Sequence, residues 1–92
     1  MTFNDLEFGP RNSGLPGVQA MVFFGNGYGA SVIKGKGSYG VDDDLYELAV
    51  IKKTEGEDWD ICYGTEIAGD DVIGFLTEYE VSTLLKQIQA LW

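Results

Sequence analysis

The chain contains no histidine, a single cysteine and only six lysines and arginines, and each shortage excludes a class of chemistry. Without histidine, the usual side chain for proton transfer near neutral pH is missing, so the sequence argues against an enzyme. Because Cys62 has no second cysteine, neither an intrachain disulfide nor a cysteine-based zinc site can form. We expect no catalytic residue, no cofactor and no metal, and we expect Cys62 to be a small buried hydrophobic residue.

Long apolar runs are also missing. No run approaches the ~20 residues that a membrane-spanning helix needs, and the N-terminus lacks the basic and apolar regions of a secretory signal. We therefore expect no membrane contact and a cytosolic setting. The chain has 92 residues, of which 45% are hydrophobic, and this is enough apolar material for one domain with its own core.

Acidic residues are abundant and unevenly distributed. Fifteen of them against six basic residues give a net charge of −9, of which −1 belongs to residues 1–53 and −8 to residues 54–92. An anionic surface can resemble a nucleic acid, which carries about one charge per 1.7 Å of duplex axis, and it can steer the protein onto a basic groove. The same charge is also typical of a small protein that is simply kept soluble. Nucleic acid itself is not an expected ligand for so negative a domain.

The residue pattern divides the chain into an arm and one domain. Residues 1–17 hold both prolines and predict an irregular N-terminal arm, while residues 18–92 predict a single compact domain. Alternating apolar residues predict strands over 18–24 and 28–34, joined at Asn26-Gly27 by a type I′ turn with positive φ at both central positions. Further strands are predicted over 45–53 and 59–63. The first of these segments also fits a helix, because acidic residues precede it and lysines end it.

The last segment of the chain predicts a helix. Thr77 and Glu80 have the spacing of a capping box, and Leu76 and Val81 have that of a hydrophobic staple. A single helical turn is predicted over 70–74. The predicted fold is α+β, an antiparallel four-stranded meander with a C-terminal amphipathic helix packed on one face. The apolar side of that helix is expected to contain Val81, Leu84, Leu85, Ile88 and Leu91.

Two glycine-rich or acidic motifs do not support ligand binding. Gly35, Gly37 and Gly40 have the spacing of a dinucleotide fingerprint, but three aspartates follow where that motif requires the N-terminus of a helix to bind phosphate. This segment is better interpreted as a surface loop. The aspartate clusters at 42–44 and 58–60 lack the layout of a calcium-binding loop, so we predict no specific metal site.

Several segments together resemble a known set of viral proteins. They are Asn26-Gly27-Tyr28-Gly29-Ala30-Ser31-Val32-Ile33, Ser38-Tyr39-Gly40, Tyr46-Glu47-Leu48-Ala49-Val50 and Asp70-Asp71-Val72-Ile73-Gly74. Over residues 18–92 the chain resembles short, uncharacterised proteins encoded by tailed bacteriophages. The resemblance implies action in the host bacterial cytoplasm and a character like that of anti-CRISPR or other anti-defence inhibitors. It carries no catalytic motif, so no site residue is transferred.

These observations lead to two hypotheses of different classes. The first is a non-enzymatic phage inhibitor that binds a bacterial host protein with a basic nucleic-acid-binding surface and blocks nucleic-acid access. The second is a phage structural or accessory module that self-associates or docks on a larger assembly. Its contact would be an exposed sheet face formed by Phe23, Met21 and Ile33, and a homodimer is one form of this hypothesis. For the first hypothesis the predicted contact residues are Glu55, Glu57, Asp58, Trp59, Asp60, Asp70, Asp71 and Tyr39.

Overall fold

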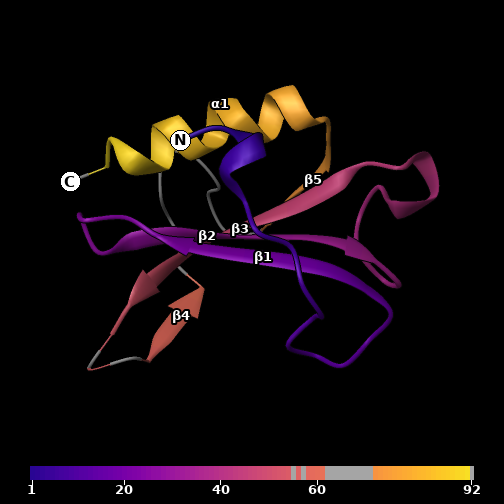
Figure 1. Cartoon of the computed structure of the whole chain (residues 1–92), viewed down its shortest axis with the longest axis horizontal. Helices are drawn as coiled ribbons and strands as arrows, with labels where there is room; N and C mark the ends of the chain where they lie inside the picture. The colour runs from indigo at the N-terminus through magenta and orange to yellow at the C-terminus, as the bar shows by residue number, and fades with distance from the viewer. Residues whose placement is uncertain (55, 57, 62–71, 92) are drawn as a thin grey trace.

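The computed structural model describes residues 1–54, 56, 58–61 and 72–91. Within these residues a helix lies across one face of an antiparallel sheet, and Figure 1 shows the two layers edge on. The elements follow one another as η1 (Phe3–Asp5), β1 (Gly17–Phe23), β2 (Tyr28–Gly35), η2 (Val41–Asp43), β3 (Tyr46–Lys53), β4 (Trp59–Ile61), β5 (Ile73–Leu76) and α1 (Glu78–Gln89), where η marks a short 3-10 helix.

The sheet confirms the predicted meander. Its main path runs β1-β2-β3-β4, and each strand pairs antiparallel with its neighbour. The segment that also fitted a helix is the strand β3. The alternating pattern with its β-branched residues favours the strand over the helix, because such residues pack well on a pleated surface between two neighbouring strands.

A fifth strand, β5, was not predicted. It pairs with β3 near Tyr46 and Leu48, whereas β4 pairs with β3 farther along, from Ile51 to Lys53. Both strands therefore share one edge of β3, since β2 occupies the other. The predicted helical turn over 70–74 is wrong at Ile73 and Gly74, which belong to this strand. Pairing with a distant edge outweighs a local capping signal, because it satisfies backbone groups that would otherwise lack partners.

The hairpin between β1 and β2 forms as predicted, but its turn is of another type. Gly27 has a φ of 86°, and Asn26 does not have a positive φ. The amide of Gly27 donates to the carbonyl oxygen of Phe24 over 3.2 Å, and the amide of Phe24 donates to that of Tyr28 over 2.7 Å. These contacts describe a three-residue loop, a type I turn followed by a left-handed glycine, so the type I′ prediction is wrong.

The helix α1 begins at the predicted cap. The amide of Glu80 donates to Thr77 Oγ1 over 3.2 Å, and the amide of Thr77 donates to Glu80 Oε1 over 3.0 Å. Two acceptors and two donors near the helix start are thereby satisfied. The buried face of the helix packs on the sheet, and the core cluster between the two layers contains the fully buried side chains Val32, Leu48, Val50, Val81, Leu85 and Ile88.

The N-terminal arm packs beneath the helix. The ring of Phe3 lies 5.0 Å from that of Tyr46 and 5.5 Å from that of Phe8, measured between centroids. The amide of Phe3 donates to Ser82 Oγ over 2.7 Å, and Ser82 is half-buried. Farther along the arm, Gly9 forms an isolated antiparallel bridge with β1. The arm thus connects the edge of the sheet to the helix.

Candidate functional site

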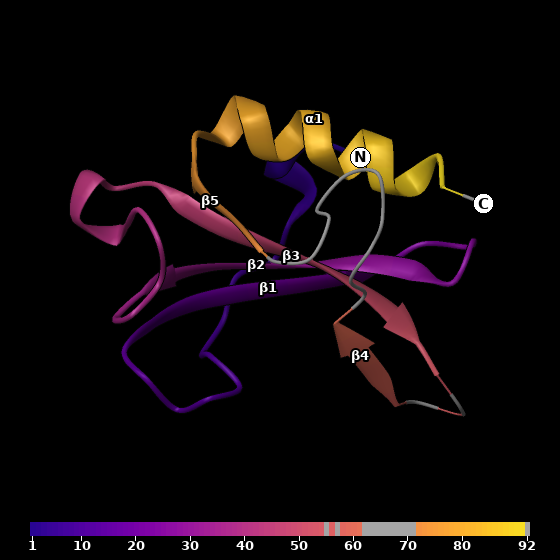
Figure 2. The same cartoon turned by 180° about the vertical axis from the view of Figure 1, so that it is seen from behind.

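Three of the predicted contact residues lie together on the β3–β4 hairpin. Asp58, Trp59 and Asp60 are all exposed there, at the end of the molecule away from the start of α1 (Figure 2). Two lysines of β3 lie beside them, because Lys52 pairs in register with Asp60 and Lys53 pairs with Trp59. The hairpin therefore carries carboxylates and ammonium groups side by side, which reduces the negative potential it can present.

Tyr39 lies at the opposite end of β3. Its amide donates to Glu47 Oε1 over 3.1 Å, whereas Trp59 pairs with Lys53 at the other end of the strand. Glu47 and Lys53 are six residue steps apart in an extended strand, a separation of about 20 Å. Tyr39 and Trp59 therefore do not belong to a single small contact. The remaining predicted contacts, Glu55, Glu57, Asp70 and Asp71, lie outside the described residues, as does Cys62.

A second group of carboxylates gathers where α1 begins. Five exposed acidic residues come from two distant segments of the chain, the turn η2 and the first turn of α1, and Figure 1 shows both segments at the same end of the molecule. We call this group the acidic end, and it consists of Asp42, Asp43, Asp44, Glu78 and Glu80. The sequence had suggested a different cluster, because charge counted along the chain gives the first of these segments little weight.

Lys34 connects the two segments electrostatically. It forms an ion pair with Asp44, and this hydrogen bond raises the pKa of Lys34 above its ordinary value, with the negative charge of Glu78 adding to the effect. Among the described residues, no other ion pair involves the acidic end. Four of its five carboxylates therefore remain without a cationic partner in that part of the chain. These are Asp42, Asp43, Glu78 and Glu80.

The turn that carries the three aspartates is fixed by its backbone. Gly40 has a φ of 94° and precedes η2, and Asp44 has a φ of 63° and follows it. The amide of Leu45 donates back to the carbonyl oxygen of Gly40 over 2.9 Å, which closes the turn. A Cβ added at Gly40 would lie 2.9 Å from Phe75 Cα, so the turn sits directly against β5. Glycine is required here both for its φ and for this close approach.

Three aromatic side chains are unusually exposed at the same end. Tyr39 is 58% exposed, Phe75 is 57% exposed and Tyr79 is 81% exposed. The amide of Phe75 donates to the carbonyl oxygen of Tyr39 over 3.4 Å, so these two lie on adjoining segments. Phe75 also has a φ of 57°, a left-handed conformation that costs a residue other than glycine about 1–2 kcal/mol. A strained phenylalanine whose ring faces solvent adds nothing evident to the core.

A groove lies beside these aromatics, between β5 and α1. It has a volume of ≈ 370 Å³ and a mostly apolar lining, with a single carboxylate on its rim. Its residues are Ile73, Leu76, Tyr79, Glu80, Thr83 and Leu84. Because Tyr79 and Glu80 belong both to the groove and to its acidic and aromatic surroundings, the three features form one continuous surface.

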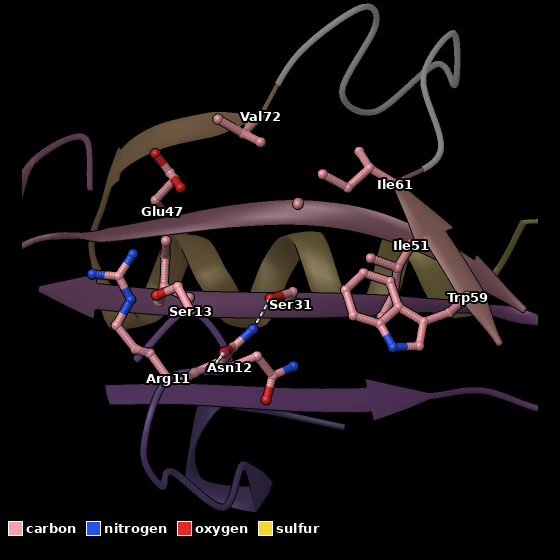
Figure 3. Close-up of a pocket in the computed structure, with 12 residues that line it drawn as sticks. Arg11, Asn12, Ser13, Ser31, Glu47, Ile51, Trp59, Ile61 and Val72 are labelled. Atoms are coloured by element: carbon pink, nitrogen blue, oxygen red, sulfur yellow. Dashed lines mark hydrogen bonds between the residues drawn. The ribbon is translucent and has the colours of Figure 1, made fainter. Parts of the chain in front are cut away.

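A different groove occupies the open face of the sheet, on the side away from α1. It has a volume of ≈ 250 Å³, and Figure 3 shows Arg11 and Glu47 toward one end and Trp59 and Ile61 toward the other. β4 turns away from the helix and places these last two side chains, 36% and 39% exposed, over the open face. The floor of the groove consists of Ser31, Ile33, Ala49 and Ile51.

Hydrogen bonds order the polar part of this open-face groove. Gln19 Oε1 accepts from the amide of Asn12 over 2.7 Å, and Gln19 Nε2 donates to Ser31 Oγ over 2.8 Å. The sheet face predicted to expose Phe23, Met21 and Ile33 is thus only half-exposed. Lys53 lies 5.0 Å from the centroid of the Phe23 ring, and Asn12 contacts the sulfur of Met21.

Two further kinds of feature are missing from the described residues. No group of three or more acidic, cysteine or histidine side chains in that part of the chain could hold a metal ion. No helix there is long and apolar enough to cross a membrane.

No family model, curated protein or solved structure matches the chain. The function must therefore be inferred from the chemistry of the two surfaces. The signal that sequence reasoning missed at the acidic end was the aspartate run at 42–44, which was not predicted to contact a partner. A capping box at Thr77 implies a carboxylate in the first helical turn. No local sequence pattern indicates that this turn lies at the same end of the molecule as the aspartates at 42–44.

Proposed function

We propose that this protein is a non-enzymatic, phage-encoded inhibitor whose acidic end occupies a basic nucleic-acid-binding surface of a bacterial host protein. The observation that carries this proposal is that five carboxylates gather at one end of the molecule, those of Asp42, Asp43, Asp44, Glu78 and Glu80. Among the described residues, only Asp44 of this group forms an ion pair, and its partner is Lys34. A dense group of carboxylates on a rigid framework presents charge as a phosphate backbone does. It also accelerates encounter with a positively charged cleft.

The absence of histidine and the exposure of these carboxylates favour binding over catalysis. General acids and bases work best in sites that exclude water and shift their proton affinity, whereas all five side chains of the acidic end face solvent. The phage origin and the site of action in the host cytoplasm rest on the resemblance of residues 18–92 to tailed-phage proteins. The binding proposal itself rests on charge and geometry.

The test is displacement of host proteins from DNA. Bacterial lysate is bound to a DNA column at moderate ionic strength, and the column is washed with the purified chain. We expect the wild type to release a discrete protein and the variant Asp42→Asn/Asp43→Asn/Glu78→Gln/Glu80→Gln to release none. Glutamine at position 80 preserves the capping box, so the variant should fold. Binding of the purified chain to the released host protein should weaken steeply with added salt.

A second variant locates the contact. Asp58→Lys/Asp60→Lys reverses charge on the β3–β4 hairpin, where the sequence had placed the contact. Loss of release by this variant alone would move the contact to the hairpin. Release of no protein by the wild type, or equal release by the wild type and both variants, would refute an electrostatic inhibitor.

A second candidate function is a structural or accessory module that docks on an assembly, or on a second copy of itself, through the open face of the sheet. The observation that favours it is the open-face groove, with Trp59 and Ile61 on its rim over a buried Ile51. An apolar contact of this kind should withstand high salt. Sedimentation at low and high ionic strength distinguishes the two functions, since self-association that persists in high salt and is lost in Trp59→Ala supports the module.

A further inference from the structure

The groove between β5 and α1 gives the acidic end a specificity that charge alone does not provide. Its floor is apolar, with Leu76 only 5% exposed, and its rim carries Tyr79, which is 81% exposed. Apolar grooves edged with aromatic rings and charge are typical of surfaces that bind another polypeptide. A partner that only supplied point charges would leave this apolar floor uncovered.

Phe75 supports the same interpretation. Its backbone is held in a left-handed conformation against Gly40, while its ring is 57% exposed. Glycine or asparagine would adopt this φ more readily. Neither the backbone conformation nor burial accounts for an aromatic residue at this position, so the exposed ring itself is the feature that needs an explanation.

The charges around the groove select the kind of side chain that would lie on these rings. Glu80 lines the groove, and Glu78 lies beside it in the same first turn of α1. A cation is therefore favoured and an anion is repelled. Arginine suits the surroundings better than lysine, because its planar guanidinium stacks on aromatic faces and binds carboxylates through two parallel hydrogen bonds.

We propose that the groove between β5 and α1 is the docking site for a segment of the partner protein that presents arginine next to an aliphatic residue. The aliphatic side chain enters the groove over Leu76 and Leu84. The guanidinium stacks on the ring of Tyr79 or Phe75 and donates hydrogen bonds to the carboxylates of Glu78 and Glu80. This inference rests on the proposed function and adds the chemistry of the partner.

The direct test uses three synthetic peptides of equal length and charge spacing. One alternates arginine with leucine, the second alternates lysine with leucine, and the third alternates arginine with serine. At physiological salt we expect the arginine–leucine peptide to bind the wild type at least about tenfold more tightly than either control, which corresponds to about 1.4 kcal/mol. We also expect its binding to shift the amide NMR signals of residues 73–84. Equal affinities, or shifts located elsewhere, would overturn the inference.

A matched variant separates this inference from the proposed function. In Phe75→Asn/Tyr79→Ser both rings are removed, while asparagine tolerates the left-handed backbone and position 79 is solvent-exposed. We expect this variant to lose about tenfold in affinity for the arginine–leucine peptide and to release less host protein from the DNA column. If it releases host protein as the wild type does while the charge-neutralised variant does not, the aromatic groove is refuted and the acidic end stands. If neither variant loses release, both proposals fail.

Discussion

The side-chain amide of Asn26, at the tip of the β1–β2 hairpin, donates to the carbonyl oxygen of Leu91 over 2.8 Å. The same Nδ2 lies 3.0 Å from the carbonyl oxygen of Ile88, and Asn26 Oδ1 accepts from the amide of Tyr28. One side chain thus closes the hairpin and donates to carbonyl groups at, and just beyond, the C-terminal end of α1. The turn takes its type I form with Asn26 in this bridging position.

Replacing Asn26 should therefore destabilise the fold in a graded way. Asn26→Ala removes all of these hydrogen bonds and should lower the free energy of unfolding by about 1–3 kcal/mol. Asn26→Asp keeps the acceptor for Tyr28 but places a negative charge at the negative end of the helix dipole, which is unfavourable by a further ~0.3–1 kcal/mol at that end. Urea unfolding of the three proteins measures both effects. Equal stability of the aspartate variant and the wild type would contradict the capping role.

Ser82 should hold the N-terminal arm in place. Its hydroxyl accepts the amide of Phe3 over 2.7 Å, so Ser82→Ala leaves a part-buried donor unsatisfied, at a cost of about 1–3 kcal/mol. Hydrogen exchange at Phe3 should accelerate in this variant. Thr83→Ala is the control, because the Thr83 hydroxyl donates only to the carbonyl oxygen of Tyr79 within the helix. Unchanged exchange at Phe3 in Ser82→Ala would show that the arm is held by its aromatic rings alone.

Gly40 should be far less tolerant of substitution than Gly37. Both glycines have a positive φ, 94° and 83°, but an added Cβ at Gly37 would meet nothing within 4 Å, while at Gly40 it would meet Phe75. Gly37→Ala should cost only the conformational term of about 1–2 kcal/mol. Gly40→Ala should cost more and should also perturb the NMR signals of β5. If the two variants are equally stable, the turn η2 does not pack on β5 as the structure describes.

The ion pair between Lys34 and Asp44 should stabilise the protein only below a limiting pH. Because the folded state raises the pKa of Lys34 above its ordinary value of 10.5, the stabilisation is complete below 10.5 and disappears as the pH rises through the raised value. Thermal unfolding should find the wild type more stable than Asp44→Asn at pH 8, with the difference shrinking above pH 10.5. A difference that stays constant across this range would exclude the ion pair as its cause. The effect should be small, since the pair is close to the surface.

Local signals in the sequence were sufficient for most of the fold. The capping box at Thr77 and the alternation in β3 describe contacts between residues close in the chain, and both predictions hold. The strand β5 could not be found in this way, because it depends on pairing with an edge of β3 that lies about 25 to 30 residues earlier in the chain. The half-buried position of Ser82 depends similarly on an arm at the other end of the chain.

The candidate site was less accessible to sequence reasoning. Counting charge along the chain favoured residues 54–92, and all but one of the predicted contacts were placed at residues 55–71. The structure instead brings an aspartate turn from the first half of the chain to the first turn of α1. Trp59 and Tyr39, predicted as aromatic anchors of one contact, lie at opposite ends of β3. Nothing in the sequence predicts a role for Phe75, because no local pattern indicates its backbone conformation or its exposure.

The distribution of long-range contacts has a kinetic consequence. Strands β1 to β4 pair with sequence neighbours and can zip together through short loop closures, whereas α1 is fastened to Phe3 and Asn26 across most of the chain. We expect the hairpins to form early and the helix to dock after the rate-limiting barrier. Substitutions at Asn26 and Ser82 should then accelerate unfolding and leave the refolding rate almost unchanged.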